Sequence, residues 1–289
     1  MRLRHRISTN FVHAQDYHYD VMGMKNRRPI KLLVTDIDGC LSNGSFSNYD
    51  LDVLRRMLEQ NERYLVGEPG VPAITYCTGR PQSYVECLAQ TTLCPYPAIV
   101  EGGVMMFTVE GHRIDTHPSV TPQELKMIRR VMDAVDDAFA ERGMSTLWEP
   151  GRALNQVLLI LPPNKSQDFL ALARDAALPV CGDAMMIDAS HLCIQFVLSR
   201  FDKGVGLRWL CSKIGIDLSE CAGFGDAVFD IPFLELCGLS GAPANADEPT
   251  KAAVDYVCQK TQPWGIVEFM EYVIDYNRRL EQEGTGHGC

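Results

Sequence analysis

A short apolar run that ends in two acids constrains this chain more than any other feature. Residues 31–41 read KLLVTDIDGCL, in which Lys31 to Thr35 have the aliphatic and β-branched character of a buried strand. Asp36 and Asp38 follow one residue apart, and two like charges about 4 Å apart repel by about 4 kcal/mol at an effective dielectric near 20. A bound Mg²⁺, which prefers hard oxygen ligands, would reverse that penalty. The sequence therefore predicts a magnesium site at the end of this strand.

The composition limits the class of protein. A chain of 289 residues with 46% hydrophobic and 22% charged residues is expected to fold as one large or two moderate globular domains. The formal net charge of −10 argues against a nucleic acid as partner. No stretch approaches the roughly 18 apolar residues that span a bilayer, and the N-terminus lacks the apolar core of a secretory signal. We expect a cytoplasmic protein without a membrane partner, whose eleven scattered cysteines are reduced.

Strand-like and helical patterns alternate over residues 31–103, as in a parallel sheet with helices on its faces. The expected strands are IKLLVT, PAITYCT and YPAIV, and the helical stretches between them cover about 50–60 and 82–90. The pattern resumes near Lys203 with a helix, the strand ECAGFGD, a short helix IPFLELCG and a C-terminal helix from about Ile266. The predicted sheet domain is therefore interrupted.

The interruption has its own organisation. Thr121 to Glu124 form a predicted capping box with proline at the first helical position, and Gly143 supplies a stop. The strand candidates STLWE, NQVLLIL and LCIQFVL follow, with a helix over about 165–176. These elements predict a small sheet covered by two helices.

Four short motifs stand in order along the chain: DIDG from residue 36, YCTGR from 76, FDKG from 201 and GFGDAVFD from 223. Each motif alone is weak, because a TGR or DKG tripeptide is common in turns and helix caps. In this order, each at a strand end or a helix start, they resemble the signatures of the haloacid dehalogenase (HAD)-like phosphohydrolases. A large insertion lies between the second and third motifs, and in this respect the chain resembles the sugar-phosphatase branch of the family. That branch contains the Cof-like, sucrose-phosphatase-like and mannosyl-3-phosphoglycerate-phosphatase-like enzymes.

The resemblance covers about residues 31–272 and implies an architecture. The expected fold class is α/β, with a Rossmann-like, doubly wound parallel sheet as the HAD-like core and an inserted α+β cap domain. The expected core comprises residues 30–107 and 201–289, and the expected cap comprises residues 108–200. Residues 1–29, basic at first and without apolar periodicity, are expected to be a peripheral or poorly ordered extension.

The first two motifs carry the expected reacting and phosphate-binding groups. Phosphoryl transfer asks a protein mainly for positioning and charge neutralisation. Asp36 would attack phosphorus and form an aspartyl-phosphate, and Asp38 would protonate the leaving alkoxide and then deprotonate the attacking water. The hydroxyl of Thr78 and the backbone N–H of Gly79 suit phosphate oxygens, with Arg80 beside them.

The last two motifs complete the expected site. Lys203 would add a positive charge between the phosphate and the nucleophile, presented by a helix that Asp202 caps. Magnesium would be held by Asp36, by the backbone carbonyl of Asp38 and by Asp226. Asp230 would not bind the metal directly but would orient Lys203 or a metal-bound water.

The insertion contains a polar and aromatic cluster around a Pro-Gly turn. Trp148, Glu149, Arg152 and Asn155 have the composition of a sugar-binding loop, and Arg152 is a candidate substrate ligand. The alternative is a surface turn with a partly buried tryptophan.

Three positions depart from the pattern of the resembled family. Phe229 stands where asparagine is common, and a phenyl ring cannot orient a metal-bound water. Cys40 stands where threonine is common, and we interpret it as a packing substitution. Glu101 to Gly103 replace the E-N-G turn of Cof-like enzymes, and we interpret them as a structural turn into the insertion.

The resulting hypothesis is a Mg²⁺-dependent phosphatase of a small phosphorylated metabolite, in particular a sugar or glycosyl phosphate. The partner is then a small phosphate ester, and the motifs leave the oligomeric state open. One alternative is a phosphosugar mutase on the same core, which would hand the phosphoryl group back to a sugar. The other is a phospho-ligand binding protein that has lost turnover, for which Phe229 is the hint.

Overall fold

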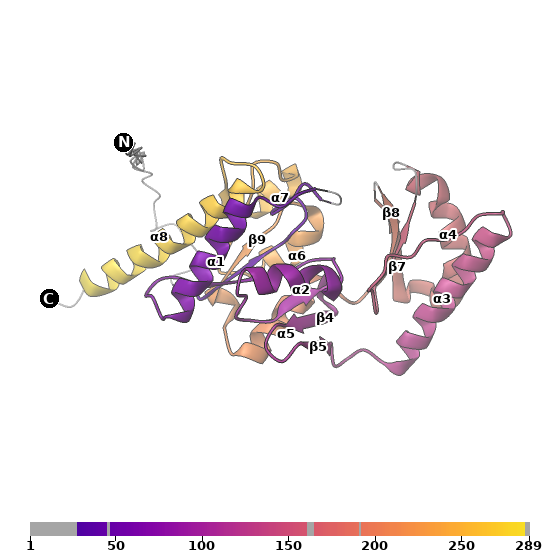
Figure 1. Ribbon diagram of the computed structural model, residues 1–289, viewed down its shortest axis with the longest axis horizontal. Helices are drawn as coiled ribbons and strands as arrows, with labels where there is room; N and C mark the ends of the chain where they lie inside the picture. The colour runs from indigo at the N-terminus through magenta and orange to yellow at the C-terminus, as the bar shows by residue number, and fades with distance from the viewer. Residues whose placement is uncertain (1–27, 45–46, 161–164, 191, 287–289) are drawn as a thin grey trace, which may run out of the picture.

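The computed structural model describes residues 28–44, 47–160, 165–190 and 192–286. It has a core with one parallel sheet and, beside it, a smaller unit with its own sheet (Figure 1). The expectation for residues 1–29 falls almost wholly outside the described residues. Within the described ranges, no helix is long and apolar enough to cross a membrane.

The core sheet has five parallel strands in the order β11-β10-β9-β1-β2. This arrangement, with helices on both faces, confirms the predicted fold class. Its strands are β11 (Tyr256–Val257), β10 (Leu239–Ala242), β9 (Cys221–Phe224), β1 (Leu32–Thr35) and β2 (Ala73–Tyr76).

Strand β1 divides the core by side-chain alternation. Leu33 packs into the cluster that includes side chains of α1, α2 and α8, whereas Leu32 and Val34 face the cluster that includes side chains of α5 and α6. Because β1 is buried on both faces, its residues form a continuous apolar run. The core helices are α1 (Leu51–Leu65), α2 (Gln82–Thr91), α5 (Lys203–Ile214), α6 (Ile231–Leu234), α7 (Glu248–Ala253) and α8 (Trp264–Gly286).

A hairpin next to the core sheet moves the expected start of the insertion. β3 (Ala98–Val100) lies beside the end of β2 through the bridge Cys77↔Ile99. β4 (Met105–Thr108) pairs antiparallel to β3, and β5 (Arg113–Thr116) pairs antiparallel to β4. The start that we expected at residue 108 was therefore too early, since β5 belongs to this hairpin. The signal was weak because β5 is largely exposed and only four residues long.

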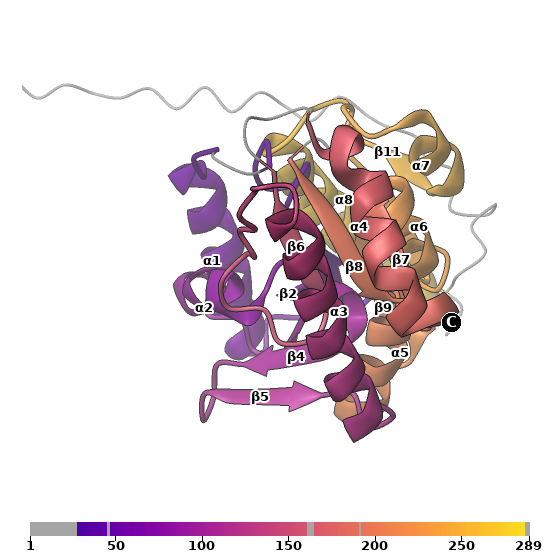
Figure 2. The same cartoon turned by 90° about the vertical axis from the view of Figure 1, so that its right-hand side faces the viewer.

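The remaining inserted elements form a unit that we call the cap: α3 (Pro122–Ala140), β6 (Gln156–Leu159), α4 (Ser166–Cys181), β7 (Met185–Ala189) and β8 (Cys193–Leu198). Its antiparallel sheet has the order β6-β8-β7, and α3 and α4 cover the face that points away from the core (Figures 1 and 2). The capping box at Thr121 and Glu124 is formed as predicted.

Two expectations for the cap were wrong. STLWE is not a strand, because only Trp148 forms an isolated bridge, to Leu158, while the rest of the segment is irregular. The strand β7 was missed, because MMIDA does not stand out from the helix that precedes it. That helix, α4, continues past Pro179 to Cys181 instead of ending near 176.

Candidate active site

The first strand delivers two carboxylates to its carboxyl end, where open α/β sheets bind their ligands. Asp36 is buried, and its backbone N–H donates to Phe224 on β9. The chain then turns at Gly39, whose φ of +82° favours glycine. A Cβ at Gly39 would lie 1.9 Å from Oδ2 of Asp226, so the glycine also lets the fourth motif approach the first.

The second motif forms a tight turn after β2. Thr78 is fully buried, and its Oγ1 accepts a hydrogen bond from the backbone N–H of Arg80 at 3.2 Å. A Cβ at Gly79 would meet no atom within 4 Å, so the backbone is open on that side. The turn can therefore present a hydroxyl and a backbone N–H to an anion.

Lys203 occupies the first position of α5, as predicted, and Asp202 caps the helix by accepting from the N–H of Val205 at 2.7 Å. The Nζ atom of Lys203 lies 2.9 Å from Oδ1 of Asp36 and also donates to the carboxylate of Asp230. Burial alone would lower the pKa of Lys203, but the charges of Asp230 and Asp36 outweigh it, and the pKa is well above its usual value. The lysine therefore stays cationic.

The fourth motif is organised around Asp230, which is completely buried. Besides pairing with Lys203, its carboxylate accepts from the backbone N–H groups of Asp226 at 2.9 Å and Ala227 at 3.1 Å. Asp230 thus contacts both the lysine and the loop that carries Asp226, and its role toward a metal or a metal-bound water stays a prediction.

Asp36, Asp226 and Asp230 together offer carboxylate oxygens within 4.8 Å of one another. Burial raises the pKa of Asp226 to about 7, and the nearby charge of Asp230 adds to it. Burial also raises the pKa of Asp36, although Lys203 opposes it. Three carboxylates share one lysine here, so the group has an excess of negative charge that suits a divalent cation with oxygen ligands.

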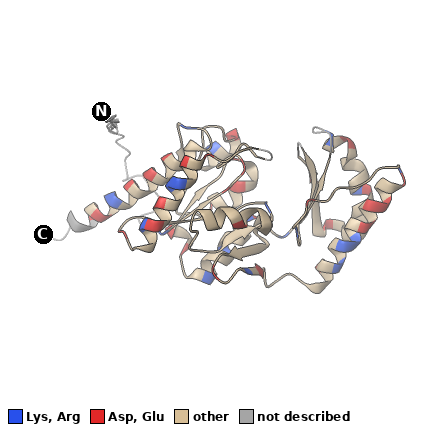
Figure 3. Cartoon of the chain, viewed as in Figure 1, with Lys and Arg blue, Asp and Glu red and all other residues tan. Residues whose placement is uncertain are grey.

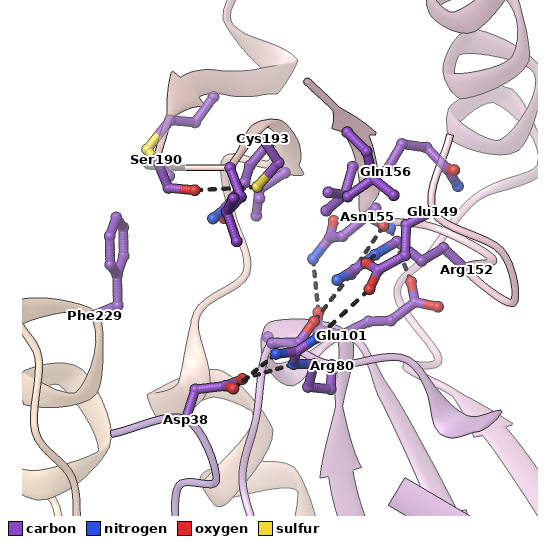
Figure 4. Close-up of a pocket in the computed structure, with 18 of the residues that line it drawn as sticks. Asp38, Arg80, Glu101, Glu149, Arg152, Asn155, Gln156, Ser190, Cys193 and Phe229 are labelled. Carbon is purple, nitrogen blue, oxygen red and sulfur yellow. Dashed lines mark hydrogen bonds and ion pairs between the residues drawn. The ribbon is translucent and has the colours of Figure 1, made fainter. Parts of the chain in front are cut away.

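Asp38 is held by an arginine from the second motif. Arg80 donates from Nε and from a terminal nitrogen to the two carboxylate oxygens of Asp38, both at 2.7 Å (Figure 4). Its guanidinium lies over the ring of Tyr84. Glu149 of the cap lies 3.7 Å from the same guanidinium. Arg80, a predicted phosphate ligand, therefore bridges the expected acid–base residue and the cap.

The cap cluster expected around the Pro-Gly turn is used in contacts within the protein. Arg152 pairs with Glu149 and donates to the carbonyl of Gly79 at 2.9 Å, which ties the cap to the second motif. Trp148 donates to Asp136 at 2.8 Å. Asn155 donates to the carbonyl of Glu101 at 2.6 Å and accepts from the N–H of Leu198.

Glu101 is a residue whose importance the sequence interpretation missed. It was taken as part of a structural turn, but its buried carboxylate accepts from the backbone N–H groups of Ala153, Leu154 and Asn155 at 2.7–2.9 Å. Burial raises its pKa even though these three donors favour the charged form. The signal available was an acid after an apolar strand, at the same position as Asp36 after β1.

Phe229 and Cys40, two positions that depart from the family pattern, differ in solvent exposure. Cys40 is fully buried beside Asp226, where burial and the neighbouring carboxylates raise the pKa of its thiol, in keeping with a packing role. Phe229 is 60% exposed and lines a cavity of about 630 Å³. The same cavity is lined by Asp38, Gly79 and Lys203, so it connects the motif residues with the cap.

Known proteins share this sequence pattern and fold. The family model of the haloacid dehalogenase-like hydrolases matches residues 146–270. A phosphoglycolate phosphatase from Methanopyrus kandleri is 26% identical over 246 residues, which cover 84% of this chain and 97% of that protein. Another, from Sulfolobus acidocaldarius, is 32% identical over 113 residues, or 39% of this chain and 47% of that protein.

Among solved structures, a haloacid dehalogenase-like hydrolase from Bacteroides thetaiotaomicron superposes with a TM-score of 0.65 at 18% identity, covering 84% of this chain and 99% of that one. The fold, the ordered motifs and these relatives define a phosphoric monoester hydrolase that acts on phosphorylated small molecules. The chain is thus similar to the haloacid dehalogenase-like hydrolases, whose family model matches its residues 146–270, and to a phosphoglycolate phosphatase over 84% of its length.

Proposed function

We propose that this chain is a Mg²⁺-dependent phosphatase that works through an aspartyl-phosphate on Asp36. One observation carries the proposal: the carboxylate of Asp36 is buried at the end of β1, 2.9 Å from the ammonium of Lys203 and within the acidic cluster. A carboxylate in this position is desolvated and fixed, as a nucleophile in phosphoryl transfer needs to be.

The donor set fits magnesium. Asp36 and Asp226 would be the direct carboxylate ligands, because the oxygens of Asp230 are already used by Lys203 and by two backbone N–H groups. The backbone carbonyl of Asp38 stays a predicted third ligand. When bound, Mg²⁺ supplies neutralisation of the phosphate charge.

The proposed reaction has two displacements. An oxygen of Asp36 attacks phosphorus, the ester P–O bond breaks, and the leaving oxygen takes a proton from Asp38. Asp38, now a carboxylate, then takes a proton from a water whose oxygen attacks the phosphorus of the aspartyl-phosphate. Inorganic phosphate leaves and Asp36 is regenerated. Lys203, the hydroxyl of Thr78 and the N–H of Gly79 would hold the phosphate oxygens during both steps.

The pair between Arg80 and Asp38 has to open during this cycle. While both oxygens of Asp38 accept from Arg80, the carboxyl group cannot give a proton to a leaving oxygen. An arriving phosphate offers Arg80 another bidentate acceptor, which would release Asp38. Arg80 would then act as the phosphate ligand that the sequence predicts.

Two substrate classes are candidates for this site. The family resemblance predicts a sugar or glycosyl phosphate, but Glu149, Arg152 and Asn155 are engaged with one another or with the core and offer a sugar little support. Curated relatives are named phosphoglycolate phosphatases, which makes phosphoglycolate a second candidate. Arg80 and Arg152 are the guanidinium groups near which its carboxylate could bind.

Hydrolysis of p-nitrophenyl phosphate tests the proposal, with Mg²⁺, with EDTA, and with the Asp36→Asn variant. Asp52→Asn serves as the matched control, because Asp52 is an exposed acid on α1 that does not line the cavity. Activity that requires both Mg²⁺ and Asp36 supports the phosphatase. Activity that needs an added sugar bisphosphate would favour the mutase, and tight phosphate binding without turnover would favour the binding protein.

A further inference from the structure

The exposed ring of Phe229 has no place in the chemistry described above. It lies on the 3₁₀ turn Val228–Asp230, which begins two residues after Asp226, and both Val228 and Phe229 are more than half exposed. In Figure 4 the ring projects from the core toward the cap segment that carries Ser190 and Cys193. Large apolar side chains that remain exposed beside a cavity are a common sign of a ligand surface.

The cap presents a matching surface on the other side of the cavity. Along β8 the side chains of Ile194, Phe196 and Leu198 are buried in the cap core, so alternation places Gln195 and Val197 on the open face. Three cross-strand pairs cover this face. They are Leu159↔Cys193, Val157↔Gln195 and Met186↔Val197.

These residues form what we call the cap wall: Val157, Leu159, Met186, Cys193, Gln195 and Val197. They line the same cavity as Phe229, and the side chain of Met186 is 43% exposed. None of the six is charged. Asp188 is the one charged residue of β6, β7 and β8; it does not line the cavity and lies 3.9 Å from Arg174.

The charged groups of the cavity lie away from the cap wall, among the motif residues and the cap loop that contacts them. Each base there is paired with acids. Arg80 pairs with Asp38 and Glu149. Arg152 pairs with Glu149, and Lys203 pairs with Asp36 and Asp230. In Figure 3 the coloured segments of the cap lie mainly on its helices, and its strands are largely uncharged. A ligand that reaches from the motif residues toward the cap wall therefore passes from charged to apolar surroundings.

We propose that the alcohol half of the substrate carries an apolar group, an aromatic ring or a branched alkyl chain, which binds between Phe229 and the cap wall. The proposal rests on the proposed phosphatase function, and it names the substrate class of that site. A cavity of about 630 Å³ accommodates a phosphate ester of this size. A bare polyhydroxyl substrate fits less well, because Leu159, Met186 and Val197 cannot hydrogen-bond to its hydroxyl groups.

Two phosphate esters, 2-phenylethyl phosphate and glucose 6-phosphate, test the proposed apolar subsite. Both are esters of primary alcohols with a six-membered ring, so their leaving groups differ little in reactivity. We expect kcat/KM for 2-phenylethyl phosphate to exceed that for glucose 6-phosphate by about tenfold or more. Phe229→Ala and Met186→Gln should each reduce that preference severalfold. Leu125→Gln is the matched control, since Leu125 is 45% exposed on α3 and does not line the cavity.

Two results would overturn the proposal. One is a wild-type preference for glucose 6-phosphate or phosphoglycolate over the phenylethyl ester. The other is an equal loss for every ester in the two wall variants, which would mean that the apolar residues serve closure of the cap and not recognition.

Calorimetry with non-hydrolysable phosphonates separates this proposal from the proposed function. Tighter binding of 2-phenylethylphosphonate than of methylphosphonate, lost in Phe229→Ala, would support the apolar subsite even if no ester were turned over. Turnover that depends on Asp36 and Mg²⁺, with equal binding of the two phosphonates, would support the phosphatase and refute the subsite.

Discussion

Replacing Glu101 by alanine should loosen the joint between the core and the cap. The carboxylate accepts from three cap N–H groups, of which those of Leu154 and Asn155 belong to buried residues while Ala153 is exposed and can turn its N–H to water. Hydrogen bonds to a charged acceptor contribute about 1.5 kcal/mol each at the low end, so the two buried groups give about 3 kcal/mol. That loss is a large part of the roughly 5–15 kcal/mol by which domains are stable.

Urea unfolding of Glu101→Ala, followed by circular dichroism, measures the effect. Glu248→Ala is the matched control, because its carboxylate is 87% exposed and pairs only with Lys251 in the next turn, so a change within about 0.5 kcal/mol is expected. Arg152 and Glu149 lie on the same cap loop, so kcat/KM should fall together with stability. An unfolding free energy for Glu101→Ala as close to wild type as that of the control would refute the reasoning.

Three further predictions concern the acidic cluster. Lys203→Met leaves Asp36 and Asp230 without their shared cation, so the free energy of unfolding should fall by about 3–5 kcal/mol. We expect kcat to be about 10²–10³-fold lower. An unchanged midpoint of urea unfolding would contradict this prediction. The pKa values of Asp36 and Asp226 are raised in the folded protein. Above about pH 4 the metal-free folded protein therefore binds more protons than the unfolded chain does. The free energy of unfolding in EDTA should consequently fall as the pH rises toward 7–8. Thermal unfolding at pH 5.5 and 8 checks the sign, and added Mg²⁺ should remove the fall; a rise in EDTA would show the opposite linkage. Gly39→Ala places a Cβ 1.9 Å from Oδ2 of Asp226, so half-saturation of activity should need about tenfold more Mg²⁺, and an unshifted magnesium titration would exclude that clash.

The core could be predicted from the sequence because each of its signals is local. A continuous apolar run fixes a strand buried on both faces, and the acids and glycine that follow it fix the end that binds ligands. Asp36, Thr78, Lys203 and Asp226 come together because parallel strands and the helices after them converge on one edge of the sheet. The spacing along the chain carries that information.

The parts that were missed depend on contacts between distant segments. β5 is polar and exposed, so its pairing with β4 has no period-two apolar signal. Glu101 acts on the backbone of residues 153–155, and no side-chain pattern records backbone donors. Likewise, the pairing of Arg80 with Asp38 over 42 residues of sequence depends on how two adjacent strand ends face each other.

Trapping the phosphoryl group on Asp36 tests the central claim most directly. In Asp38→Asn the first displacement of p-nitrophenyl phosphate can still occur, because its leaving group needs no proton, while the water attack lacks its base. Mass spectrometry of an acid-quenched digest should then find the peptide with Asp36 phosphorylated, and the same peptide of Asp36→Asn unmodified. Steady turnover by the wild type, with no phosphorylated peptide in Asp38→Asn and activity retained in Asp36→Asn, would contradict the account.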